Sequence, residues 1–150
     1  MGFRDTLPDW VLNHLDEYLE DGEKGHYWDA EFLGGYRKTP TLLLSTTGRR
    51  TGQIRIMPLP YGRDGDNYVV IASRGGTPDH PGWYHNLVAN PKVELQVVNE
   101  HFAARARTAT GDERAGLWQM MSEVYPPYPS YQTRCEREIP VVVLGPVNTT

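Results

Sequence analysis

Hydrophobic residues recur at helical spacing in two parts of the chain. In residues 8–20 every third or fourth position is apolar and acidic residues lie between, so this stretch predicts a short amphipathic helix. A second helix is predicted after Thr110, because Glu113 three residues later completes a capping-box sequence. A shorter helix is expected after Pro81. The apolar positions of the second helix are interpreted as core residues: Leu117, Met120, Met121 and Val124.

Short apolar segments rich in β-branched residues predict six strands. Pro58 and Pro60 interrupt the second of these segments, so that strand belongs at an edge of the sheet. Asp64 and Gly65 mark a hairpin turn before the third. Residues 21–38 are punctuated by glycine and predict a connecting segment. The six predicted strands are residues 39–47, 53–61, 68–73, 93–99, 101–108 and 139–145.

These elements predict a mainly β fold of the α+β class. Hairpins connect most of the strands, so the pairing is expected to be mostly antiparallel. A small closed or partly split β-barrel with flanking helices fits best, because closing the sheet removes its edges. With 150 residues, the chain is long enough for one domain.

Composition excludes several classes of protein. The net charge of -4, without a lysine-rich block, argues against nucleic acid as partner. No apolar run is long enough to span a bilayer, which argues against an integral membrane protein. The single cysteine, Cys135, cannot build a disulfide framework and indicates a reducing cytoplasm. The five histidines show no metal-ligand spacing, so no metal site is predicted.

Two glycine-bounded turns carry candidate binding residues. Gly48 and Gly52 bracket "RRT", in which Arg49 and Arg50 offer planar guanidinium groups suited to phosphate or carboxylate. The backbone N–H groups of this loop are expected to point into one concavity. The alternative is a solvated hairpin tip. In the second turn, "ASRGGT", the backbone of residues 73–76 is favoured as a ligand contact because consecutive glycines permit close approach.

Three tyrosines follow in the segment "YPPYPSYQ": Tyr125, Tyr128 and Tyr131. The prolines are taken to exclude a regular α-helix here. A tyrosine ring covers a planar ligand and its hydroxyl donates a hydrogen bond. Simple packing of a loop over the barrel end is the alternative.

Five segments in the same order resemble the deazaflavin-dependent nitroreductases of actinobacteria, also called the F-420H2-dependent quinone reductase family. They are "LLLSTTGRRTGQIRIMPL", "IASRGG", "PGWYHNLVANPKVELQV", "YPPYPSYQ" and "REIPVVVL". The resemblance implies a six-stranded antiparallel split β-barrel, similar to FMN-binding split barrels, that binds coenzyme F-420. This coenzyme is a 5-deazaflavin with an anionic phospholactyl-polyglutamate tail. The implied domain covers residues 34–150, after an N-terminal helix and connecting segment in residues 1–33.

The resemblance also assigns residues to the coenzyme. In the family the loop that matches Arg49, Arg50 and Thr51 holds the coenzyme's phosphate, so the tail supplies the counter-charge that the arginine pair lacks. Further matches border the deazaflavin ring or tail: Arg55, Pro58, Ala72, Ser73, Arg74, Gly75, Trp83 and Asn86.

The implied reaction is hydride transfer from F-420H2 to a quinone, enone or nitro-aromatic acceptor. Tyr125, Tyr128 and Tyr131 match tyrosines of the family's substrate wall, and Ser73 matches a serine near the acceptor. We expect Tyr128 or Tyr131 to hydrogen-bond the charge that builds on an acceptor oxygen. Pro60 stands where the nitroimidazole-activating member has an aromatic residue, so this pocket wall differs in shape.

Two alternatives stay open at the level of sequence. One is a non-catalytic F-420 carrier, and the other is a split barrel that binds FMN or haem. The expected partner is a small-molecule electron acceptor, and the expected location is the cytoplasm, with peripheral attachment to a membrane left open. The physiological acceptor, the oligomeric state and the role of the N-terminal helix are not determined by these residues.

Overall fold

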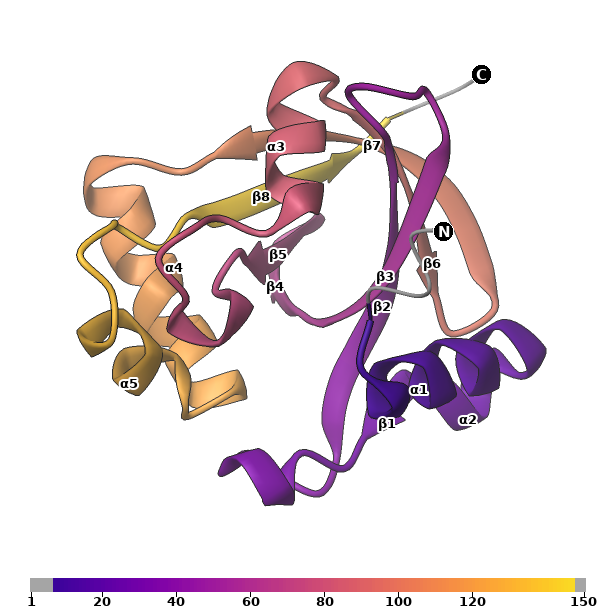
Figure 1. The fold of residues 1–150 in the computed structure, drawn as a ribbon, viewed down its shortest axis with the longest axis horizontal. Helices are drawn as coiled ribbons and strands as arrows, with labels where there is room; N and C mark the ends of the chain where they lie inside the picture. Colours follow the sequence, from indigo (N-terminus) through magenta and orange to yellow (C-terminus); the bar gives the residue numbers. More distant parts are fainter. Residues whose placement is uncertain (1–6, 148–150) are drawn as a thin grey trace.

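The computed structural model describes residues 7–147, which form one curled antiparallel sheet with helices around it (Figure 1). The strand order is β1-β2-β6-β7-β8-β5-β4, and β3 pairs with β2 alone among the described strands. The strands are β1 (Tyr27–Trp28), β2 (Thr39–Thr47), β3 (Ile54–Pro60), β4 (Gly62–Asp64), β5 (Asn67–Ile71), β6 (Lys92–Val97), β7 (Glu100–Thr108) and β8 (Val141–Pro146).

Helices cover both ends of this curled sheet. In Figure 1, α4 lies beside β5 and β8 with α5 next to it, while α1 and α2 lie at the opposite side, against β3 and β2 respectively. The helices are α1 (Asp9–Glu20), α2 (Gly22–His26), α3 (Gly82–Ala89), α4 (Gly111–Val124) and α5 (Tyr128–Thr133), with single 3-10 turns η2 (Glu31–Leu33) and η3 (Arg74–Gly76).

The predicted fold class is confirmed, but the predicted number of strands is wrong. All six predicted strands are present, and β1 and β4 are additional. These two strands have only two and three residues, too few to show the alternation that identifies a strand in a sequence. The predicted hairpin is present, with Gly65 at a φ of 60° in its turn. The edge position of β3 agrees with its prolines.

Two local predictions are wrong for physical reasons. Residues 128–133 form helix α5 despite their prolines, because Pro127 is the N-cap and Pro129 lies in the first turn, where a missing N–H costs nothing. The capping box at Thr110 does not form, since its side chain makes no cap hydrogen bond. Glu113 instead makes a bidentate ion pair with Arg107, with N···O distances of 2.6 and 2.9 Å.

The sheet buries both of its faces. Val142 and Leu144 of β8 belong to a cluster that includes Trp83 and Leu87 of α3. The alternate residues of β8 pack in a second cluster with α4 and α5. Because side chains alternate across a strand, burial on both sides explains why the segment "VVVL" is apolar throughout.

Buried Tyr18 of α1 helps to hold the N-terminal segment against the barrel. The Tyr18 hydroxyl lies 3.0 Å from the Thr41 carbonyl oxygen and accepts a bond of 2.9 Å from the Val98 N–H. Burial raises the pKa of Tyr18 to about 12, so the hydroxyl stays protonated. Residues 21–38, predicted as a connecting segment, contain α2, β1 and η2. A domain boundary at residue 34 stays a prediction.

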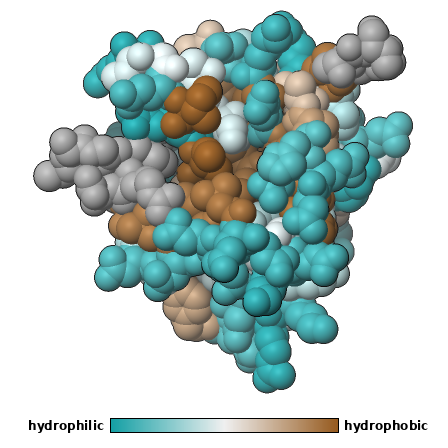
Figure 2. Space-filling model, turned by 90° about the vertical axis from the view of Figure 1, so that its right-hand side faces the viewer, coloured by the Kyte–Doolittle hydropathy of each residue, from teal (hydrophilic) through white to brown (hydrophobic). Residues whose placement is uncertain are grey.

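No described helix has both the length and the apolar character needed to cross a membrane. Figure 2 shows one face of the molecule, where hydrophobic residues gather in a patch that hydrophilic residues surround.

Candidate active site

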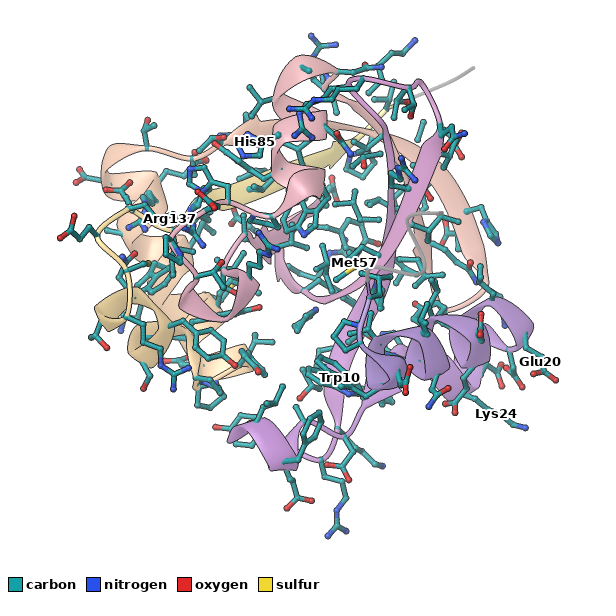
Figure 3. All side chains as sticks on the ribbon, viewed as in Figure 1. Trp10, Glu20, Lys24, Met57, His85 and Arg137 are labelled. Atoms are coloured by element: carbon teal, nitrogen blue, oxygen red, sulfur yellow. The ribbon has the colours of Figure 1, made fainter. Side chains whose placement is uncertain are left out.

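A cavity of about 950 Å³ opens between the barrel and its flanking helices. Figure 3 shows two of its lining residues, Trp10 and Met57, on the side of α1 and β3, while His85 lies on α3 across the molecule. The lining combines residues of β3 and η3 with aromatic residues from the N-terminal segment, α3 and α5. Segments that are far apart in the sequence therefore meet in one concave site.

The loop after β5 presents unpaired backbone N–H groups to this cavity. Ser73 has a right-handed helical conformation, with φ -82° and ψ -41°, and Arg74 is left-handed, with a φ of 45°. Successive residues of opposite hand point their N–H groups into one concavity, which is a nest for negative charge. Among the described residues, the N–H groups of Ser73, Arg74 and Gly75 have no hydrogen-bond partner. The nest is therefore free to bind a ligand oxygen.

The nest is fixed against the tyrosine helix by close packing. Gly76 has a φ of 81°, and a Cβ atom there would collide with the carbonyl oxygen of Tyr131. Glycine is required at this position both for its backbone conformation and for this approach. The nest and α5 consequently form one continuous wall of the cavity.

The arginine loop between β2 and β3 separates its two guanidinium groups. Arg49 turns onto α3, where its Nη1 donates to Asn86 Oδ1 at 3.0 Å and its backbone N–H donates to the same oxygen at 3.2 Å. Arg50 is exposed and makes no polar contact with another described residue. The partners of Arg49 are all neutral, so no carboxylate of the described chain offsets this pair.

The backbone of the arginine loop is less available than the sequence predicted. The N–H groups of Gly48 and Gly52 are used within the loop, at 2.7 and 2.8 Å. The Gln53 N–H donates to the Thr51 hydroxyl at 3.2 Å. The prediction that this loop's N–H groups converge in one concavity is therefore wrong for these three groups.

Three tyrosines, two of them on α5, continue the wall that begins at the nest. The hydroxyl oxygens of Tyr125 and Tyr131 lie 2.8 Å apart, so one of them donates to the other. The Tyr128 hydroxyl has no hydrogen-bond partner within residues 7–147. Burial raises the pKa of both Tyr125 and Tyr128 far above the ordinary value for tyrosine, so their hydroxyls remain donors.

An aromatic stack joins the N-terminal segment to this wall. The rings of Trp10 and Trp28 are 5.4 Å apart and nearly parallel, and Trp28 stacks on Tyr125 at 6.0 Å. His14 stacks on Trp28 and its Nε2 lies 2.8 Å from the Gly25 carbonyl oxygen. Burial lowers the pKa of His14, which favours the neutral imidazole. The N-terminal helix thus supplies part of the cavity.

The structure brings most of the predicted site residues to this cavity. The predicted residues that line it are Arg49, Pro58, Ser73, Arg74, Gly75, Trp83, Tyr125, Tyr128 and Tyr131. The predicted residues outside its lining are Arg50, Thr51, Arg55, Ala72 and Asn86. Asn86 is buried and holds Arg49 on one side while it donates to Thr46 Oγ1 at 3.2 Å on the other.

Sequence reasoning missed several residues of the site. Trp10, Trp28 and His14 precede the five segments that resemble the family, and no motif marked them. His80 belongs to no metal-ligand motif in the sequence, yet it lines the cavity. Pro60, which was expected in a pocket wall, does line the cavity, whereas the hydroxyl of Tyr61 lies 2.8 Å from His26 Nε2 at the N-terminal segment. The described residues contain no cluster of histidine, cysteine or carboxylate side chains that fits a metal ion.

Comparison with known proteins assigns this architecture to a family. A family model described as F-420H(2)-dependent quinone reductase matches residues 21–146. An F-420H(2)-dependent quinone reductase of Mycobacterium tuberculosis is 49% identical over 141 residues, which cover 90% of this chain and 95% of that protein.

Solved structures resemble this chain either in both sequence and fold or in fold alone. An F-420-H2 dependent reductase is 40% identical, with a TM-score of 0.66 over 70% of this chain and 93% of the other. A haem-binding protein from Mycobacterium smegmatis is 19% identical, with a TM-score of 0.57 over 71% of this chain and 46% of the other, and shares the fold alone. The chain belongs to the F-420H(2)-dependent quinone reductase family, a family of oxidoreductases with F-420 as cofactor, as its motifs predict.

Proposed function

We propose that the cavity binds F-420H2 against the Ser73–Gly75 nest and reduces a quinone held against the tyrosine wall. The observation that carries the proposal is the nest itself, whose three N–H groups have no partner among the described residues. Such a donor set suits the oxygen-bearing edge of a planar coenzyme. The cavity of about 950 Å³ is large enough for a cofactor, since ligand pockets commonly measure roughly 300–1,000 Å³.

The positive charges around the cavity support the same orientation of the coenzyme. Arg49 and Arg74 line the cavity and Arg50 is exposed beside it, so an anionic tail that leaves the nest passes cationic groups. Guanidinium groups bind phosphate and carboxylate oxygens through paired N–H donors. Asn86 acts through Arg49 and keeps that side chain directed along α3.

When bound, F-420H2 supplies a hydride to the acceptor. The chain's part is to place the acceptor and to stabilise the oxygen that gains negative charge. The Tyr128 hydroxyl is suited to donate that hydrogen bond, because it has no partner among the described residues. Its raised pKa makes it a lasting hydrogen-bond donor rather than an acid. In the Tyr125–Tyr131 pair one hydroxyl proton is also left over for the substrate.

The aromatic composition of the cavity supports planar acceptors. Trp10, Trp28 and the α5 tyrosines offer flat apolar surface beside hydroxyl donors. Quinones, enones and nitro-arenes all combine a planar apolar body with oxygens that accept electrons. We therefore extend the acceptors to enones and nitro-aromatic compounds. We also propose a cytoplasmic location for the enzyme, on the basis of its single free cysteine.

Two titrations and one assay test this function. Fluorescence titration is done with F-420 and, in parallel, with FMN, and we expect a saturable response to F-420. Oxidation of F-420H2 is then followed by absorbance after menadione is added, and we expect steady turnover. Tight FMN binding without a response to F-420 would overturn the proposal, and F-420 binding without turnover of any quinone, enone or nitro acceptor would make the protein a carrier.

A further inference from the structure

One guanidinium group holds the carbonyl side of the coenzyme loop. Arg137 Nε donates to the Thr77 carbonyl oxygen at 2.9 Å, and its Nη2 donates to the Ser73 carbonyl oxygen at 2.7 Å. Its Nη1 donates to the Ala72 carbonyl oxygen at 3.2 Å. Arg137 does not line the cavity, so it acts from behind the wall. Arg137 therefore binds the carbonyl oxygens on one side of this loop, while the nest N–H groups of the same loop have no partner among the described residues.

The same guanidinium bonds a histidine of the cavity wall. Arg137 Nη1 lies 2.9 Å from His80 Nδ1. Arginine has only donors, so Nδ1 must be the acceptor, and in a neutral imidazole the proton then sits on Nε2. The two ring nitrogens point in diverging directions, so Nε2 is directed away from Arg137. His80 lines the cavity and no hydrogen bond joins its Nε2 to another described residue, so the Nε2–H is available to a ligand.

Neighbouring groups keep this imidazole neutral. Burial lowers the pKa of His80, and the positive charge of Arg137 lowers it further. His85 acts in the same direction, while Asp79 opposes it. The rings of Tyr84 and His85 pack on His80, with centroids 4.9 and 5.7 Å away.

We propose that Arg137 is a positioning residue for two sets of donors at once: it holds the Ala72–Thr77 loop so that the nest faces the coenzyme, and it fixes His80 as the tautomer whose Nε2–H donates to the same coenzyme. The inference rests on the proposed function, because it takes F-420 as the ligand of the nest. His80 is then a binding residue for the coenzyme, and Arg137 shapes the site although it does not line the cavity.

Arginine is the one side chain that serves all four acceptors. Its planar fork carries five N–H donors in fixed directions, and here they reach three carbonyl oxygens and one imidazole nitrogen. A lysine ammonium has three donors around one point and cannot span this set. Arg137→Lys therefore keeps the charge but loses the geometry.

The first experiment reads the tautomer without coenzyme. Long-range proton–nitrogen NMR correlation distinguishes a protonated from an unprotonated ring nitrogen, and His80→Asn identifies the signals of His80 by their loss. We expect wild type to carry the His80 proton on Nε2. In Arg137→Met and Arg137→Lys we expect loss of this single tautomer. An unchanged Nε2–H tautomer in both variants would overturn the role of Arg137.

The second experiment measures F-420 affinity in a matched pair of His80 variants. In His80→Asn the amide oxygen takes the place of Nδ1 and keeps the bond to Arg137, but no donor remains at the Nε2 position. In His80→Gln the amide nitrogen reaches the Nε2 position and keeps a donor there. We expect the Kd for F-420 to rise about 5-fold in His80→Asn, the worth of one hydrogen bond, and to stay near wild type in His80→Gln. Equal affinity in both variants and wild type would overturn the role of His80.

Steady-state kinetics and thermal unfolding distinguish a positioning role of Arg137 from a role in folding alone. We expect Arg137→Lys to raise the KM for F-420H2 about 10-fold, with a smaller change in kcat, because the lost contacts serve binding of the coenzyme. Thermal unfolding is measured for every variant, with Arg105→Met on the exposed face of β7 as the matched arginine control. If Arg137→Met does not fold, Arg137→Lys and the His80 pair still decide the outcome.

The two proposals fail in different ways. If wild type does not bind F-420 although the NMR result holds, the proposed function is wrong and the Arg137–His80 tautomer contact remains. If wild type binds F-420 but neither the tautomer nor the affinity responds to these variants, the proposed function stands and this inference is wrong.

Discussion

The hydroxyl oxygens of Tyr125 and Tyr131 lie 2.8 Å apart, while the hydroxyl of Tyr128 bonds to no other described residue. The rings of Tyr125 and Tyr128 are in contact, with centroids 4.7 Å apart. Three tyrosines of one wall therefore differ in what their hydroxyls are free to do. Tyr125 and Tyr131 share one hydrogen bond, whereas the Tyr128 hydroxyl is left entirely for a ligand.

This difference predicts unequal effects of replacing each tyrosine. We expect Tyr128→Phe to lower kcat with menadione on the order of 10²-fold, because it removes a donor aimed at the oxygen that gains charge. Tyr125→Phe and Tyr131→Phe each strand one buried hydroxyl and should lower the free energy of unfolding by about 1–2 kcal/mol, with smaller effects on kcat. Unchanged turnover in all three variants would remove these tyrosines from the mechanism.

The two arginines of the β2–β3 loop should contribute by different routes. Arg50→Gln removes only a charge, so we expect several-fold weaker F-420 binding at low salt and a shrinking difference as salt rises, since charges are screened over about 10 Å at 0.1 M. Arg49→Gln also removes the bond to Asn86, so part of its loss should persist at high salt.

Titrations of F-420 at several salt concentrations check this, with Arg105→Gln as the control for net charge. Affinity that stays the same in the double variant Arg49→Gln/Arg50→Gln at every ionic strength would contradict the assignment of the anionic tail to this loop.

Asn86 should be important for stability and for coenzyme binding together. It is buried, and its amide bonds the Arg49 backbone and side chain and the Thr46 hydroxyl. We expect Asn86→Ala to lower the free energy of unfolding by about 2 kcal/mol, measured by urea denaturation, because buried polar partners are left unsatisfied. F-420 affinity should fall as well. Full stability in Asn86→Ala would show that these bonds are not needed for the fold.

Burial of His14 predicts a loss of stability in mild acid. Its folded-state pKa is lowered from the ordinary 6.5 by burial, which outweighs the opposing effects of the Gly25 hydrogen bond and the nearby Glu17 charge. Between the folded and unfolded pKa values the unfolded chain binds more protons, so the free energy of unfolding decreases as pH falls below about 6.5.

Urea denaturation at about pH 7.5 and at about pH 5, on either side of the ordinary histidine pKa of about 6.5, checks this expectation. The pKa values of His26 and His80 are also lowered, so both residues add to the slope of the free energy of unfolding against pH. His14→Gln keeps a polar side chain and should flatten the curve. A slope identical to wild type would mean that His14 does not contribute.

Much of the fold could be predicted from local sequence patterns, because each pattern reflects a constraint on the backbone of a single strand or helix. Alternation and β-branched residues mark the long strands, since a pleated strand buries its residues by alternate faces. Pro58 and Pro60 placed β3 at an edge, because a proline has no N–H for a second neighbour. Proline alone misled at α5, where its position within the first turn, not its presence, decides whether a helix forms.

The motifs gave the family and most of the cavity's barrel side, because those residues lie in continuous segments such as "TGRRTG" and "ASRGG". They could not give the Trp10–Trp28–Tyr125 stack, since its three rings come from separate segments that only packing brings together. They also could not show that the Tyr128 hydroxyl is unpaired, because pairing depends on side-chain distances.

By itself, the sequence determined the class of fold, the family and the kind of cofactor, since these follow from local periodicity and contiguous motifs. Tertiary structure alone decided that Arg137 lies behind the Ser73–Gly75 nest and bonds His80 at 2.9 Å. Arg137 and His80 are separated by 57 positions in the chain, and no local pattern joins them. The physical reason is that a hydrogen bond acts over about 3 Å of space whatever the separation along the chain.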